Sequence, residues 1–173
     1  LLGIEPSCMR EALEDIKIRG RAELIPTYAD YTVALDYAHN GVAMNSFLEA
    51  MREYNPKRLI AVFGCGGDRD ATKRPKMGKI ADEAADIVVV TSDNPRSEDP
   101  QLIISDILAG IKTVNTQKVY VEPDRRTAIS MLKNIAKEND VVVLAGKGHE
   151  DYQILKNETI HFDDREEARK VFN

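Results

Sequence analysis

Short apolar segments alternate with longer amphipathic ones from about residue 32 to the end of the chain. Five of the apolar segments are nearly continuous in hydrophobic, often β-branched residues: Thr32–Asp36, Leu59–Phe63, Ile87–Thr91, Lys118–Val121 and Val141–Ala145. Runs of this kind are typical of strands that are covered on both faces. Repeated strand and helix units favour a parallel sheet, so the pattern predicts an α/β domain.

The amphipathic segments predict four helices between these strands, at about 41–54, 75–85, 100–111 and 124–138. Their hydrophobic residues recur every three or four positions, as in a helix with one buried face. The positions that follow this rule are Met44, Phe47, Leu48, Met51, Leu102, Ile103, Ile107 and Ile111. We expect Asp124 to be the N-cap of the fourth helix and Asp163 the N-cap of a last helix near the C-terminus.

Two regions depart from this alternation. Residues 152–155 and 159–162 read as a small hairpin or an edge strand, which would make the mostly parallel sheet a mixed one. Residues 1–30 contain a short helical pattern around 11–16 but no clear strand and helix unit. We therefore interpret 1–30 as a linker or the tail of a preceding central domain, and 31–173 as the folded domain.

Composition narrows the class of protein. The 173 residues, with 43% hydrophobic and 31% charged side chains, fit a single globular domain. The net charge of −5 argues against nucleic acid as a partner. No apolar run approaches the ~20 residues that cross a bilayer, so we expect a cytoplasmic protein without a membrane partner.

Cysteine and histidine usage predicts no metal site. Cys8 and Cys65 are far apart and belong to no CxxC or Cys/His cluster, so we expect both to be reduced packing residues. His39, His149 and His161 also lack the spacing of metal ligands.

The least ordinary local sequences follow the predicted strands. In open α/β sheets, ligands bind outside the carboxyl ends of the strands, which is where these loops lie. Each loop alone has a simpler interpretation, as a flexible turn or a solvated charged face, and Gly146-Lys147-Gly148 lacks the GxxxxGK[ST] spacing of a P-loop. Their convergence on one edge indicates a site. The loops are residues 36–41, 64–70 with 73–75, 92–96 and 146–151.

Taken together, D-Y-A-H-N at 36–40, G-C-G-G-D-R-D at 64–70, K-R-P at 73–75, D-N-P-R at 93–96 and G-K-G-H-E-D-Y-Q at 146–153 resemble the C-terminal domain of the Mur ligases. The resemblance runs from about Gly20 to the C-terminus and is strongest to the members that use meso-diaminopimelate. It implies a Rossmann-like, three-layer α/β domain of about six strands, the third of three domains in a longer enzyme.

The resemblance also implies roles for individual residues. Those matching the pocket for meso-diaminopimelate are Arg69, Asp93, Asn94, Pro95, Arg96, Gly146 and Glu150. Those matching positions that reach ATP are Arg21, Asp36, His39 and Asn40. The residue chemistry agrees, because diaminopimelate is lysine with an extra distal carboxylate, and arginine binds carboxylates through a planar fork. A loop acid such as Glu150 can hold an ammonium group.

In the ligase that the resemblance implies, ATP and Mg²⁺ activate the D-glutamate carboxylate of UDP-N-acetylmuramoyl-L-alanyl-D-glutamate as an acyl phosphate, and the amine of diaminopimelate attacks it. This chain has no P-loop, so ATP and Mg²⁺ would be held mainly by the central domain of the same polypeptide. We expect no catalytic residue and no ligase activity in this chain by itself.

Two other functions remain open from the sequence. A response-regulator receiver places acids after its first and third strands and a lysine after its fifth, which Asp36, Asp93 and Lys147 mimic. The chain is also compatible with a stand-alone amino-acid-binding module that has no ligase partner.

Overall fold

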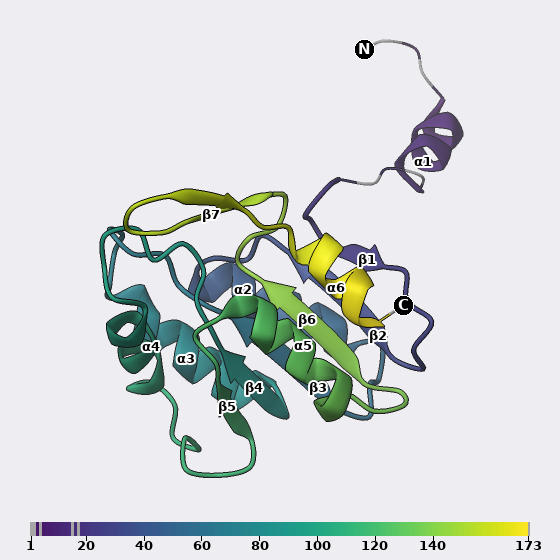
Figure 1. Ribbon diagram of the computed structural model, residues 1–173. Coiled ribbons are helices and arrows are strands. Elements are labelled where there is room, and N and C mark those ends of the chain that lie inside the picture. The colour runs from purple at the N-terminus through teal and green to yellow at the C-terminus, as the bar shows by residue number, and fades with distance from the viewer. Residues whose placement is uncertain (1–2, 4, 15, 17, 173) are drawn as a thin grey trace.

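The computed structural model describes residues 3, 5–14, 16 and 18–172, and within them a six-stranded sheet forms the centre of the fold (Figure 1). The strands lie in the order β1 (Glu23–Ile25), β2 (Thr32–Asp36), β6 (Val141–Ala145), β3 (Leu59–Phe63), β4 (Ile87–Val90) and β5 (Val119–Val121). β1 pairs antiparallel with β2, whereas all the other neighbouring strands are parallel. The five predicted strands are confirmed to within one residue at each end.

Helices cover both faces of this sheet (Figure 1). On one face are α2 (Gly41–Arg52), α3 (Lys73–Ala84) and α4 (Pro100–Leu108), and on the other are α5 (Arg125–Ile135) and α6 (Asp164–Phe172). Each face has its own hydrophobic core, and alternate residues of β3 pack into one or the other. Ala61 and Phe63 pack with α2 to α4, whereas Ile60 and Val62 pack with α5 and α6. The predicted three-layer α/β architecture is therefore confirmed.

Side-chain caps determine where several helices begin. Asn40 accepts a hydrogen bond from the Ala43 amide at the start of α2, and Asp124 accepts one from the Thr127 amide at the start of α5. Asp163 likewise accepts from the Arg165 amide just before α6. A cap of this kind satisfies a backbone N–H that has no partner within the helix. The predicted caps Asp124 and Asp163 are confirmed.

Two predicted packing positions are wrong. Leu102 is 64% exposed, because Ile103, Ile104 and Ile107 form the buried face of the short helix α4. Cys8 is exposed on α1 (Pro6–Glu14), whereas Cys65 is buried as predicted. Apolar spacing predicts the buried face of α2 correctly and that of α4 except at Leu102, because residues 102–104 are all apolar and only two of them reach the core.

The N-terminal region contains a strand that the sequence did not reveal. β1 pairs with β2 from Glu23 opposite Leu35 to Ile25 opposite Val33, so it is this strand that makes the sheet mixed. The predicted hairpin forms instead a separate two-stranded sheet of β7 (Tyr152–Ile154) and β8 (Thr159–His161). α1 begins earlier than the predicted helix and lies apart from the sheet in Figure 1; residue 15 of that prediction lies outside the described residues.

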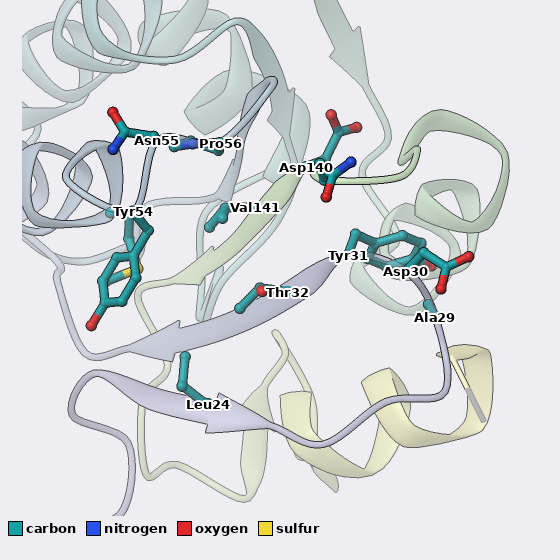
Figure 2. Close-up of a pocket in the computed structure, with 12 residues that line it drawn as sticks. Leu24, Ala29, Asp30, Tyr31, Thr32, Tyr54, Asn55, Pro56, Asp140 and Val141 are labelled. Atoms are coloured by element: carbon teal, nitrogen blue, oxygen red, sulfur yellow. The ribbon is translucent and has the colours of Figure 1, made fainter.

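A cavity of about 520 Å³ lies at the amino ends of β2 and β6, where Thr32 and Val141 begin their strands. Figure 2 shows Leu24, Tyr31 and Tyr54 among the side chains around it. Its lining contains none of the residues predicted to form a site. No helix in the described part of the chain is long and apolar enough to cross a membrane.

Candidate functional site

The candidate site lies along the carboxyl edge of the sheet, where β2, β6, β3 and β4 end side by side. The four loops that follow these strands contact one another directly. The Gly146 amide donates to the Asp36 carbonyl over 3.1 Å, and the Gly67 amide donates to the Asn94 carbonyl over 2.9 Å. The sequence prediction that these loops converge is confirmed as a matter of geometry.

Two glycines allow this close approach. A β-carbon on Gly67 would lie 1.9 Å from the Pro95 carbonyl oxygen, which no other residue type tolerates. Gly146 has a φ of +112°, and a β-carbon there would lie 3.1 Å from Oδ2 of Asp93. Side chains at these positions would push apart the loops that carry the candidate residues.

Asn94 connects the loops after β4 and β6. Its Nδ2 donates to Oε2 of Glu150 over 2.8 Å, and its Oδ1 accepts from the Ile154 amide at 2.9 Å and from Nζ of Lys147 at 3.2 Å. These bonds fix the orientation of the Asn94 amide and hold the Glu150 carboxylate by one oxygen. The other oxygen, Oε1, forms no hydrogen bond with another described residue.

Lys147 is the residue that sequence reasoning missed. Its side chain is 0% exposed, and its ammonium lies 3.4 Å from Glu150 Oε2 and 3.7 Å from Asp93 Oδ1. The Asp93 side chain is also buried, and burial raises its pKa, although the nearby cations Lys147 and Arg125 act against this rise. The local sequence around Lys147 gave no sign of burial, so only the tertiary contacts reveal this buried cation.

Arg96 and Arg69 both lie close to Gly66. A β-carbon on Gly66 would be 2.8 Å from Nη1 of Arg96 and 3.7 Å from Cγ of Arg69. Nη1 of Arg96 donates to the carbonyls of Gly67 and Asn94, which leaves Nε and Nη2 without a partner among the described residues. Neither Arg96 nor Arg69 forms an ion pair with another described residue. Seven other arginines do: Arg19, Arg52, Arg58, Arg74, Arg125, Arg126 and Arg165.

The backbone of Arg96 is held in an unusual conformation. Its φ is +54°, in the left-handed region that residues other than glycine rarely adopt, and its amide donates to the Ile154 carbonyl over 3.0 Å. Such a conformation costs free energy and is found in clusters at functional sites. The bond to β7 therefore links the position of Arg96 to the hairpin that follows the Gly146 loop.

A second network supports the loop after β3. Arg74 is buried and donates from Nη2 to both carboxylate oxygens of Glu98 at 2.8 Å, and from Nη1 to Asp106 at 2.9 Å. These bonds lower the pKa of Glu98, whose carboxylate also accepts from the Asp68 amide. The charged run at 69–74 is therefore not simply a solvated face, because its arginine at position 74 ties this loop to the one after β4.

The residues predicted to contact the nucleotide gather around Tyr37. The Arg21 guanidinium lies 4.8 Å from the centre of the Tyr37 ring, and Nδ1 of His39 lies 2.9 Å from the Tyr37 carbonyl oxygen. Asp36 accepts from the amides of Ala22 and Ala38, each over 2.8 Å, and so ties the chain before β1 to the end of β2. The Asn40 side chain is engaged as the cap of α2.

The described residues contain no group of three His, Cys, Asp or Glu side chains that could hold a metal ion. The receiver interpretation also finds no support, because a phosphorylated aspartate must be reached from solvent and Asp93 is only 7% exposed. Pro95 is buried beneath the loop after β3 and contributes its carbonyl to the contact with Gly67.

Comparisons with known proteins identify the family of this chain. The family model "Mur ligase, glutamate ligase domain" matches residues 20–148. The UDP-N-acetylmuramoyl-L-alanyl-D-glutamate–2,6-diaminopimelate ligase of Clostridium botulinum is 53% identical over 96% of this chain, and that of Thermosynechococcus vestitus is 52% identical over 98%. The chain spans only 34% of the length of each of these relatives.

Solved structures show the same relationship. A UDP-N-acetylmuramoyl-L-alanyl-D-glutamate–2,6-diaminopimelate ligase superposes with a TM-score of 0.83 at 40% identity, over 92% of this chain and 32% of that one. A folylpolyglutamate synthase of Mycobacterium tuberculosis gives a TM-score of 0.64 at 20% identity, over 83% of this chain and 33% of that one, which shows the fold alone. From the family match and these identities, the chain belongs to the Mur ligase family, in which it forms the glutamate ligase domain.

Proposed function

We propose that this chain recognises meso-diaminopimelate within a longer, ATP-dependent ligase that joins it to UDP-N-acetylmuramoyl-L-alanyl-D-glutamate. The names of the relatives that are about half identical to the chain support this substrate, and their greater length supports a ligase with further domains over a stand-alone module. The same proposal assigns the protein to the cytoplasm, where ATP and nucleotide-linked precursors occur.

The observation that carries the proposal is that Arg96 and Glu150 are both bonded to Asn94, and that each keeps hydrogen-bonding groups without a partner among the described residues. Arg96 donates to the Asn94 carbonyl through Nη1 only, and Glu150 accepts from the Asn94 amide through Oε2 only. The remaining guanidinium donors suit the distal carboxylate of diaminopimelate, since arginine binds carboxylates through two parallel hydrogen bonds. The free Glu150 oxygen suits its ammonium group.

The other proposed pocket residues complete the site around these two anchors. Arg69 adds a second cation beside Gly66, and Gly146 lets Asp93 lie close to the loop after β6. Asp93 and Pro95 hold the loop that carries Asn94 and Arg96. None of these residues is assigned a role at the amide bond that is formed.

For the nucleotide, we propose that Arg21 and Asp36 reach ATP held by another domain, with His39 and Asn40 beside them. An arginine near Tyr37 fits a phosphate group, and a carboxylate at a strand end fits ribose hydroxyls. Asp36 already holds two backbone amides, so it is well fixed for this contact. The described residues offer no cluster for Mg²⁺, which would be held outside this chain.

In this scheme the work of the domain is positioning. ATP supplies the phosphoryl group that activates the acceptor carboxylate, and this chain holds the amine of diaminopimelate where it can attack. Aligning two reactants can account for about 7–11 kcal/mol of a reaction barrier.

Calorimetry of this chain with meso-diaminopimelate, L-lysine and ATP in parallel tests the proposal. We expect meso-diaminopimelate to bind at least tenfold more tightly than L-lysine, since a hydrogen bond to a charged group is worth about 1.5–3 kcal/mol. Arg96→Ala should remove that preference, whereas Arg169→Ala, on the exposed side of α6, should keep it. Equal affinity of the unmodified chain for the two amino acids, or binding of neither, would overturn the proposed substrate.

A further inference from the structure

Beneath the candidate site, Arg125 and Asp164 form an ion pair that is entirely removed from solvent. They are the first residues of α5 and α6, and each side chain is 0% exposed. Nε of Arg125 lies 2.8 Å from Asp164 Oδ1, and Nη2 lies 2.7 Å from Oδ2. This is the paired fork geometry in which arginine binds a carboxylate most strongly.

The same guanidinium also donates to two backbone carbonyls at the carboxyl edge of the sheet. Nη1 donates to Ser92 over 3.3 Å, and Nη2 donates to Ala145 over 3.1 Å. Ser92 directly precedes Asp93, and Ala145 directly precedes Gly146. A single side chain therefore contacts the chain directly before Asp93 and directly before Gly146, in the two loops that carry all the proposed diaminopimelate residues except Arg69.

These two loops are not neighbours through the sheet. β4 and β6 are separated by β3, so no ladder of backbone hydrogen bonds connects their ends. Arg125 spans this gap from the face covered by α5. Its charge also acts on Asp93, where it opposes the effect of burial on the pKa of that carboxyl.

Stability alone does not account for such a pair. Removing two charges from water costs about as much as their attraction returns, and apolar replacements of buried pairs are often neutral or stabilising. What an apolar pair cannot do is donate hydrogen bonds to Ser92 and Ala145. The feature that requires an arginine here is therefore the connection between the two loops.

We infer that Arg125, held by Asp164, is a positioning residue that fixes the loop at 93–96 relative to the loop at 146–150. Its consequence for amino-acid binding rests on the proposed function, whereas its effect on loop geometry does not. Lysine cannot replace it, because one ammonium group cannot form the fork with Asp164 and also reach both carbonyls.

The decisive variant combines Arg125→Met with Asp164→Leu, which removes both charges and keeps an apolar contact. If the pair served only the stability of the fold, a double variant with a near-normal unfolding midpoint should also keep its loops in place. If Arg125 positions the loops, the same variant should unfold at a near-normal midpoint but have more mobile loops. Arg125→Lys, which retains the charge opposite Asp164, serves as a second variant with less risk to folding.

Amide hydrogen exchange followed by NMR reports on the loops without any ligand. The amides of Gly67, Arg96 and Gly146 each bond across loops of the site, whereas those of Asn139 and Val141 bond at the opposite edge of the sheet. In both variants we expect exchange of the first three to rise about ten- to a hundredfold and that of the last two to stay unchanged.

A matched control is Arg58→Lys at that opposite edge. Arg58 also pairs with a buried aspartate, Asp140, and donates to a backbone carbonyl, that of Ile135. The Arg58→Lys variant should speed amide exchange at Asn139 and Val141 and leave the exchange of the Gly67, Arg96 and Gly146 amides unchanged. Unchanged exchange at Gly67, Arg96 and Gly146 in a folded Arg125 variant would overturn the inference, as would an equal change at all five amides.

The binding measurement separates this inference from the proposed function. If the unmodified chain binds meso-diaminopimelate, both Arg125 variants should bind it at least tenfold more weakly, again by the scale of a charged hydrogen bond. If the unmodified chain does not bind it, the proposed substrate fails while the exchange pattern still decides whether Arg125 positions the loops. If the unmodified chain binds meso-diaminopimelate and the variants bind it equally well, the inference about Arg125 is wrong while the proposed substrate stands.

Discussion

Replacing Lys147 with methionine is the sharpest test of the charge balance in the site. Methionine keeps the length and apolar stem of lysine but removes the ammonium. That ammonium is fully buried and faces Glu150 at 3.4 Å, Asp93 at 3.7 Å and the Asn94 oxygen at 3.2 Å. The substitution leaves two carboxylates close together without the cation between them.

The distances set the size of the effect. With an effective dielectric constant of about 20, each carboxylate attracts Lys147 by roughly 4–5 kcal/mol at these separations. Part of this attraction offsets the cost of burying the charges, and breaking a buried pair from one side typically destabilises a protein by about 3–5 kcal/mol. We expect a loss of that size at pH 7, which a domain with ordinary stability survives.

The loss should depend on pH with a definite sign. Burial already raises the pKa of Asp93, and loss of Lys147 raises it further. A carboxyl whose pKa is higher in the folded state than in the unfolded state destabilises the fold when it is ionised. This destabilisation is absent at pH values below the pKa of the carboxyl in the unfolded state, and it is complete at pH values above its pKa in the folded state. The deficit of the variant should therefore shrink as the pH falls from 7 toward 4, by about 1.4 kcal/mol for each pH unit by which the substitution raises the pKa of Asp93.

Urea unfolding followed by circular dichroism at several pH values measures this deficit. Lys79→Met is the control, because Lys79 is exposed and, among the described residues, pairs only with Glu83 along its own helix, so it should change stability by less than about 0.5 kcal/mol. A Lys147→Met deficit below about 1 kcal/mol, or one that grows as the pH falls, would refute the assignment of Lys147 as the counter-charge of this cluster.

Three further predictions follow from the structure. In the full-length ligase, Arg96→Ala should lower kcat/KM for meso-diaminopimelate roughly ten- to a few-hundredfold and hardly affect L-lysine, so equal losses would remove Arg96 from the pocket. This chain alone should release no phosphate from ATP with both ligase substrates present, and release would contradict the assignment of ATP chemistry to other domains. A thiol reagent should label exposed Cys8 rapidly in the folded chain and Cys65 only after unfolding, because burial raises the pKa of Cys65 to about 12. Labelling followed by mass spectrometry checks the last prediction.

The strands of the sheet could be predicted because their signal is local. In β3 and β6 every residue is buried, and a continuous run of apolar side chains marks that condition in the sequence itself. β1 carries no such signal, since Glu23 and Leu24 are partly or largely exposed and its pairing with β2 depends on the tertiary arrangement. The sequence therefore predicts the buried strands and the apolar edge strand β5, and misses β1 at the other edge.

The site divides in the same way. The loops after the strands could be predicted as a group, because parallel strands bring their carboxyl ends to one edge. The burial of Lys147 could not, since it depends on Asn94, a residue 53 positions earlier in the chain. Arg125 was missed for a similar reason, as its position at the start of a helix gives no sign that it reaches carbonyls after two different strands.

The distribution of charge explains how this pocket would distinguish its substrate. Arg125 pairs with Asp164, and Lys147 lies close to both Asp93 and Glu150, whereas the Arg96 fork forms no ion pair with another described residue. Under the proposed function, L-lysine would leave that fork without a partner.

The size of this discrimination follows from the exposure of Arg96. A fully buried unpaired charge would reject the wrong amino acid by several powers of ten, as sites with buried polar groups do. Arg96 is only partly buried, so water replaces much of the missing interaction. The preference for diaminopimelate should then come mainly from the gained attraction, which limits it to about ten- to a few-hundredfold in binding. Under the proposed function, any stronger selection would arise where the amine is aligned for attack, which depends on the spacing of the two loops that we infer Arg125 to set.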